Sequence, residues 1–210
     1  MGCQFGLTLL HREAPSGSFD EVFPRLSFYH SYYCRIKQKV EGDLVNLRRF
    51  SLNVHPDSVV QVARKMVQEV ATLPYVLELK VIAQKEEVYK RLDNIIVYFY
   101  DSADNTNKKD LKQRLFSYRE YTRPSHPAMM EPIANNIQGI AFADESGVPA
   151  DSGWGDTRVK PIVDAIWDIK VHDEFIPFEK LLPTVEQRFK ESGIDPEAPQ
   201  WNIKTPSGQK

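Results

Sequence analysis

The sequence predicts an α+β domain, in which helices pack against a mostly antiparallel sheet. Segments with strand character recur between segments with helical periodicity, and two of the strands alternate polar with apolar residues. Such alternation is typical of antiparallel sheets, which commonly have one buried face and one face in contact with water. With 210 residues, of which 41% are hydrophobic and 27% charged, the chain is long enough to bury a sizeable core.

The clearest elements lie in the first half of the chain. Residues 49–54 alternate with a period of two and predict a strand. A histidine–proline pair ends this strand, and Asp57 or Ser58 can cap the helix that follows. Apolar residues at helical spacing predict that helix over 59–70, and a second strand follows over 76–83.

The second half continues the alternation of helices and strands. A charged linker over 84–93 leads to a third strand at 95–100, which contains Tyr98. The pattern then predicts a helix, a short strand or extended segment, and two further helices, at 109–121, 137–143, 157–169 and 183–193. Pro124 ends the first of these helices, because proline cannot continue a helix.

One domain over residues 28–193 accounts for these elements. An N-terminal extension, 1–27, contains a turn signal of proline, glycine and serine, and residues 194–210 are expected to form a tail. The dense aromatic segment 28–33 is compatible with either a helix or a strand. No apolar segment approaches the roughly 20 residues of a membrane-spanning helix, so a cytoplasmic location is the default.

Composition and motifs exclude several function classes. The net charge is −2, from 27 basic and 29 acidic residues, and no basic stripe accompanies the aromatic residues, so we expect no nucleic-acid binding. The five histidines lack metal-site spacing and the two cysteines form no C-x-x-C pair, so no metal and no other cofactor is expected. The sequence also has no phosphate-binding loop, dinucleotide-binding glycine motif or serine-nucleophile motif.

Polar side chains on the three strands are the candidates for chemistry. Arg49, Lys80 and Tyr98 each lie opposite the apolar stripe of their strand, and Arg91 comes shortly before the third strand. If the strands are neighbours in the sheet, these four side chains converge on a basic pocket. They suit a phosphate group, because they offer guanidinium forks, a point charge and a hydroxyl donor. The alternative is that they form the wetted face of an antiparallel sheet.

Several short motifs resemble the core of the Hop family A type III effector domain. They lie at 49–54, 79–81, 91–98, 139–145 and 155–158, and the resemblance covers roughly residues 28–170. Domains of this kind also occur as stand-alone lyases in the biosynthesis of ribosomal peptides of the lanthipeptide or thioamitide type, beside kinase-like partners. They are distantly similar to the OspF/SpvC phosphothreonine lyases.

The resemblance implies a metal-free β-elimination of phosphate from phosphoserine or phosphothreonine in a peptide or protein, which leaves dehydroalanine or dehydrobutyrine. Lys80 occupies the place of the catalytic base that takes the α-proton, and Tyr98 matches a tyrosine of the same site. Arg49, Arg91 and Arg158 occupy the places of phosphate-binding residues. Neighbouring positive charges and partial burial are expected to lower the pKa of Lys80, so that its amine can act as a base.

One position departs from the phosphothreonine lyases, which have a histidine as general acid two residues after the first basic residue. This chain has Ser51 there. His55, Tyr98 and Tyr32 are candidates to supply the acid instead, or the arginines stabilise the departing phosphate without one. Ser51, His55 and Tyr32 are also candidates for contacts with the peptide.

The resemblance also implies partners. The substrate is expected to be a phosphorylated peptide, and a kinase-like partner protein is expected to install the phosphate. Two alternatives remain: a non-catalytic peptide-binding subunit of a kinase–lyase complex, or an effector that is secreted into a host cell and acts on host phosphoproteins. No interaction with a membrane is expected.

Overall fold

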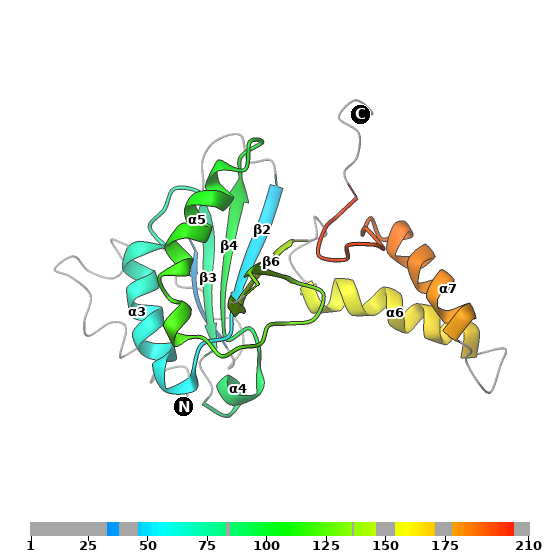
Figure 1. The fold of residues 1–210 in the computed structure, drawn as a ribbon, viewed down its shortest axis with the longest axis horizontal. Helices are drawn as coiled ribbons and strands as arrows, with labels where there is room; N and C mark the ends of the chain where they lie inside the picture. Colours follow the sequence, from blue (N-terminus) through cyan, green and yellow to red (C-terminus); the bar gives the residue numbers. More distant parts are fainter. Residues whose placement is uncertain are drawn as a thin grey trace. The chain divides into compact units, whose positions relative to one another are not determined.

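The structure is a computed structural model that describes residues 46–82, 85–135, 137–145, 154–170 and 178–203 and the backbone of 33–37 (Figure 1). The chain divides into two compact units, Met1–Phe142 and Ala143–Lys210. The second unit contains the helices α6 (Trp154–Lys170) and α7 (Phe178–Glu191). One domain over 28–193 stays a prediction, since contacts define these units and do not test whether either folds alone.

The first unit is built on a six-stranded sheet with the strand order β1-β3-β4-β2-β6-β5. The strands are β1 (Tyr33–Lys37), β2 (Asn46–Leu52), β3 (Val76–Ile82), β4 (Ile95–Asp101), β5 (Glu131–Ala134) and β6 (Ile137–Asp144). β4 pairs antiparallel with β2 on one side and with β3 on the other, and the pairs β1–β3 and β5–β6 are also antiparallel. The predicted α+β class with a mostly antiparallel sheet is therefore confirmed.

Two helices pack against this sheet, as Figure 1 shows. α3 (Val59–Glu69) follows the 3-10 turn η1 (Pro56–Ser58) and buries one side, because its valines, alanine and methionine recur at helical spacing. α5 (Thr106–Phe116) buries two leucines in the same way. The Tyr118 hydroxyl, just after α5, donates to Glu69 Oε2 of α3 at 2.6 Å, so the two helices lie side by side.

Three phenylalanines form the core between α5 and the sheet. Phe50 of β2 stacks on Phe99 of β4 with ring centroids 5.4 Å apart, and Phe142 of β6 lies 4.9 Å from Phe50. All three side chains are buried. The Lys108 ammonium of α5 lies 3.9 Å from the centre of the Phe142 ring, so α5 packs directly on this cluster. Arg49 and Ser51, which flank Phe50 on β2, therefore point to the opposite face of the sheet.

Two helical segments of the first unit differ from the sequence prediction. The predicted charged linker 84–93 contains a short helix, α4 (Lys85–Lys90), which has too few apolar residues to show a helical period. The helix predicted over 109–121 begins and ends earlier, at Thr106–Phe116, and is followed by a separate 3-10 turn, η2 (Arg119–Tyr121). The short helix matters for the site, because it immediately precedes two of the charged residues described below.

The segment after α7 turns back toward the end of that helix. Gly193 ends the helix with φ +71°, and the Ile194 N–H donates back to the Phe189 carbonyl at 2.8 Å. Ile194 is buried and forms an antiparallel bridge with Asn202. Residues 194–203 therefore turn back in an ordered segment, where the sequence predicts a tail, because the glycine reverses the chain and an isoleucine is available to be buried.

Some predicted segments lie outside the described residues, namely the N-terminal extension 1–27, most of the aromatic segment 28–33, and the tail residues 204–210. Within the part of the chain that the structure describes, no helix combines the length and the hydropathy that crossing a membrane requires.

Gly139 of β6 lies where two backbone segments meet. The Asn53 N–H donates to the Gly139 carbonyl at 2.8 Å, and a Cβ at this glycine would stand 2.3 Å from the Arg123 carbonyl oxygen. Since that oxygen belongs to backbone, Gly139→Ala is expected to destabilise the protein by about 1–3 kcal/mol or more. Urea unfolding measures the effect, with Gly155→Ala as control, because nothing lies within 4 Å of a Cβ there. Equal unfolding free energies of the two variants contradict the prediction.

Candidate functional site

The register of the three central strands places the predicted site residues in adjacent rows on one face. Tyr98 of β4 lies opposite Arg49 of β2 on one side and opposite Glu78 of β3 on the other. In the next row of the same face, Lys80 of β3 and Ser51 of β2 lie on either side of the same residue of β4. Because directly opposed residues share a face, all five side chains point to the face opposite the phenylalanine core.

Tyr98 connects the two cations of these rows. The Arg49 guanidinium carbon lies 5.4 Å from the centre of the Tyr98 ring, and Lys80 Nζ lies 6.0 Å from the same point. Arg49 is 4% exposed and donates to the Ser51 hydroxyl at 3.2 Å. Both cations therefore contact one ring, which supplies an electron-rich face to each of them.

Arg91 joins the cluster through Asp93. Arg91 Nε donates to Asp93 Oδ1 at 2.9 Å, and Asp93 Oδ2 lies 3.6 Å from Nη2 of Arg49. The side chain of Arg91 is 42% exposed, that of Asp93 17% and that of Arg49 4%. The three linked charges therefore run from the protein surface at Arg91 to a buried position at Arg49. We call Arg49, Lys80, Arg91, Asp93 and Tyr98 the site cluster. Arg49 and Lys80 contact Tyr98, and Arg91 reaches Arg49 through Asp93, whereas the predicted basic pocket and the chemical roles of these residues stay predictions.

The other predicted site residues have separate positions. Ser51 is fully buried beside Arg49. His55 is exposed in the turn after β2, where its backbone N–H donates to the Tyr121 carbonyl at 2.7 Å. Tyr32 lies outside the described residues. Neither His55 nor Tyr32 is therefore placed at the site cluster by a contact.

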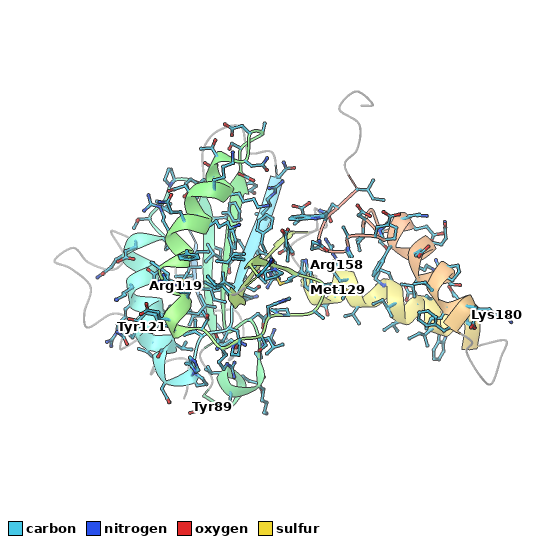
Figure 2. All side chains as sticks on the ribbon, in the orientation of Figure 1. Tyr89, Arg119, Tyr121, Met129, Arg158 and Lys180 are labelled. Atoms are coloured by element: carbon cyan, nitrogen blue, oxygen red, sulfur yellow. The ribbon has the colours of Figure 1, made fainter. Side chains whose placement is uncertain are left out.

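Arg158 belongs to the second unit, where it projects from α6 and is fully buried (Figure 2). Its Nε donates to the Pro199 carbonyl at 2.8 Å, and its Nη2 donates to Asn202 Oδ1 at 2.8 Å. Nη2 also lies 3.4 Å from the Asp144 carbonyl, and the guanidinium lies over the Trp154 ring. These contacts join α6 to the segment that turns back after α7. The phosphate-binding role of Arg158 stays a prediction.

Asn94 fixes the link between α4 and β4, which carries Arg91 and Asp93. Its side chain is fully buried. Its Nδ2 donates to the Val54 carbonyl at 2.7 Å, and its Oδ1 accepts from the Val54 N–H at 2.8 Å. The amide thus pairs with the backbone at the end of β2 as a neighbouring strand does, which satisfies two buried backbone groups.

Asn53 and Arg123 form a second connection between segments that lie far apart in the sequence. Asn53 continues the polar side of β2 beyond Arg49 and Ser51, and it is fully buried. Its Oδ1 accepts from Arg123 Nε at 2.7 Å, and its Nδ2 donates to the Ser125 carbonyl at 2.9 Å. The alternating pattern indicates which face Asn53 takes, but no local pattern indicates a partner 70 residues away.

On the helix side of the sheet, several pKa values are shifted by packing. Burial lowers the pKa of Lys108, and the charge of Arg48 acts in the same direction. The Tyr75 hydroxyl donates to Asp110, and this hydrogen bond lowers the pKa of the carboxyl, while burial raises the pKa of Tyr75. These groups belong to the packing of α5 on the sheet. In the described residues, no group of three or more histidine, cysteine or acidic side chains is arranged to hold a metal ion.

Fold and site together define an α+β domain whose mostly antiparallel sheet carries an arginine and a lysine in contact with one tyrosine on one face, with a second arginine joined to them through Asp93. The chain belongs to the HopA1 effector protein family, whose model matches residues 24–201. The resemblance of the short motifs to Hop family A effector domains is thereby confirmed.

Solved structures with a similar fold include two effectors of Pseudomonas syringae. The effector of pathovar tomato strain DC3000 is 20% identical with a TM-score of 0.61, and that of pathovar syringae strain 61 is 20% identical with a TM-score of 0.60. In both cases the match covers 82% of this chain and 63% of the effector, so the chain spans less than two thirds of the effectors' length.

The VirA (SpvC) phosphothreonine lyase effector of Chromobacterium violaceum is 16% identical, with a TM-score of 0.46, over 73% of this chain and 90% of that protein. No curated protein matches the chain.

Proposed function

We propose that this protein is a phosphoserine/phosphothreonine lyase that removes phosphate from a peptide by β-elimination without a metal ion. The observation that carries the proposal is the contact of Arg49 and Lys80 with the ring of one tyrosine, Tyr98. A base beside a phosphate ligand is what an elimination requires. The motifs shared with Hop family A effector domains support the same assignment.

The chemistry needs one base and one anion site. The neutral amine of Lys80 takes the α-proton of the phosphorylated residue, and the electron pair of that C–H bond forms the Cα=Cβ double bond. The Cβ–O bond breaks at the same time, and inorganic phosphate leaves with its bonding pair. Dehydroalanine or dehydrobutyrine remains in the peptide. Arg49 and Arg91 hold the phosphate and offset the charge that develops on the leaving oxygen.

More than one side chain is a candidate to donate a proton to the leaving oxygen. The Tyr98 hydroxyl belongs to the site cluster and is our first candidate. Ser51, at the place of the histidine in phosphothreonine lyases, accepts a hydrogen bond from Arg49 and has a hydroxyl proton to offer. His55 and Tyr32 remain candidates for peptide contact, and Arg158 remains a candidate phosphate ligand.

The test is mass spectrometry of a phosphothreonine peptide after incubation with the full chain in the presence of EDTA. Elimination removes the mass of phosphoric acid. Hydrolysis instead regenerates threonine and gives a peptide that is heavier than the elimination product by one water. A subsequent thiol addition to the new double bond confirms dehydrobutyrine. An unchanged peptide, a dephosphorylated peptide, or activity that needs an added metal contradicts the proposal.

The peptide chain around the phosphate is expected to contribute to turnover. A peptide of about a dozen residues should be eliminated with a much higher kcat/KM than phosphoserine or phosphothreonine alone, because contacts remote from the reacting bond supply binding energy for the transition state. Steady-state assays of phosphate release compare the two substrates. Equal kcat/KM values point to a metabolic enzyme and contradict a peptide substrate.

Two settings fit the proposed reaction. Membership of a family of effectors supports delivery into a host cell and action on host phosphoproteins. The alternative setting is cytoplasmic, in ribosomal-peptide biosynthesis beside a kinase-like partner, where the chain is either the lyase or a peptide-binding subunit. Binding of the phosphopeptide without a change in its mass identifies the subunit role.

A further inference from the structure

We infer that Arg123 is a positioning residue for the proposed reaction, which holds Arg91 and Asp93 in place against β2. The inference rests on the proposed function of the site cluster. It concerns the link between α4 and β4, residues 91–94, which we call the site loop. Arg123 lies outside the cluster, in the segment between η2 and β5.

The guanidinium of Arg123 binds the carbonyls where α4 ends. Its Nη2 donates to the Arg91 carbonyl at 2.7 Å, and its Nη1 donates to the Tyr89 carbonyl at 3.0 Å. The Val88 carbonyl lies 3.4 Å from Nη2. Tyr89 marks this place in Figure 2. The last carbonyls of a helix lack partners within the helix, so a cation at this end both satisfies and stabilises them.

The same side chain is tied to β2 at its other end. Arg123 Nε donates to Asn53 Oδ1 at 2.7 Å, and the Arg123 backbone N–H donates to the Asn53 carbonyl at 2.7 Å. Asn53 is fully buried on the polar side of β2, the side that carries Arg49. The Arg123 guanidinium therefore connects β2, which carries the buried Arg49, with the site loop, which carries the exposed Arg91.

This connection requires the shape of arginine. Its planar fork reaches the loop carbonyls through both terminal nitrogens while Nε stays on Asn53, and a lysine, with one ammonium, cannot make both sets of contacts. The backbone of Arg123 is also held in place, because its carbonyl approaches Gly139 too closely for any side chain there. The position of the site loop relative to β2 is thus set by Arg123 together with Asn94.

Loss of this connection is expected to appear in substrate binding. If the site loop shifts, Arg91 and Asp93 lose their fixed distance from Arg49, and the phosphate loses one of its two guanidinium ligands. Displacement of a ligand group by about 1 Å lowers kcat/KM on the order of 10- to 100-fold. Lys80 and Tyr98 lie on paired strands and keep their places, so the chemical step is affected less.

The experiment measures KM and kcat of Arg123→Ala and Arg123→Lys in the full chain with a phosphothreonine peptide, below the unfolding temperature of each variant. We expect kcat/KM to fall about 10- to 100-fold in both, mostly through a higher KM, with a smaller fall in kcat because Arg91 also offsets charge on the leaving oxygen. Guanidinium ion at a low, non-denaturing concentration should lower the KM of Arg123→Ala. Arg119→Ala is the control, since that exposed arginine contacts the Phe116 carbonyl and ring instead.

Amide hydrogen exchange of the site loop gives a readout that does not depend on activity. Faster exchange at residues 91–94 in Arg123→Ala, and not in Arg119→Ala, supports the inference. Unchanged exchange overturns it, and so does a loss of stability with unchanged KM, which indicates a structural role alone. If the wild-type protein eliminates no phosphate, the proposed function fails, and the exchange data still decide whether Arg123 holds the loop.

Discussion

Lys80→Met is expected to fold normally and to lower kcat for phosphate elimination by about 10²–10⁴-fold or more, because it removes the proposed base for the α-proton. Lys80 is partly exposed on β3, and methionine keeps an unbranched apolar stem beside the Tyr98 ring. The measurement is phosphate release from a phosphothreonine peptide, with circular dichroism to confirm the fold.

Two further variants make this test specific. Lys109→Met, at an exposed position of α5, removes an equal charge on the other side of the sheet and should leave turnover unchanged. Lys80→Arg keeps the positive charge but stays protonated, so it should bind the phosphopeptide and fail to eliminate phosphate. If Lys80→Met eliminates at nearly the wild-type rate, Lys80 is not the base.

Phe50→Ala is expected to have the largest effect on stability. Phe50 is fully buried and contacts both Phe99 and Phe142, so its removal leaves a cavity at the centre of the core. Such substitutions cost about 3–5 kcal/mol, which is a large part of the roughly 5–15 kcal/mol that stabilises a domain.

Urea unfolding of Phe50→Ala measures this loss, with Phe116→Ala as the matched control. Phe116 is 40% exposed at the end of α5, so the same truncation there should cost much less. A similar loss in both variants shows that the phenylalanine cluster is not the centre of the core.

The sequence indicates correctly which residues share a face of each strand. Arg49 and Ser51 alternate with Phe50, and Lys80 alternates with Leu79, because successive side chains in a strand point to opposite faces. This periodicity is a property of a few consecutive residues, so it can be recognised without the rest of the chain. It is the reason that the site face could be predicted.

Strand order could not be predicted in the same way. β4 lies between β2 and β3, although it follows both in the sequence, and this order places Tyr98 between Arg49 and Lys80. Contacts between distant segments decide such an order. For the same reason the sequence gives no signal for Arg123, whose partners lie 32 to 70 residues away. β5 was missed because it has four residues and contains Pro132.

Asp93 is a counter-ion of the arginines of the site. In the proposed reaction, a phosphate therefore binds these arginines by exchange with the Asp93 carboxylate. This carboxylate already occupies a place between Arg49 and Arg91, so an arriving phosphate must compete with an internal counter-ion. The affinity of the proposed site for phosphate is then the difference between two sets of charge-assisted contacts, so we expect moderate binding. For the proposed reaction, we expect the return of Asp93 to the guanidinium groups to assist release of inorganic phosphate after the Cβ–O bond breaks. In the proposed lyase, the same carboxylate thus weakens substrate binding and speeds the release of product.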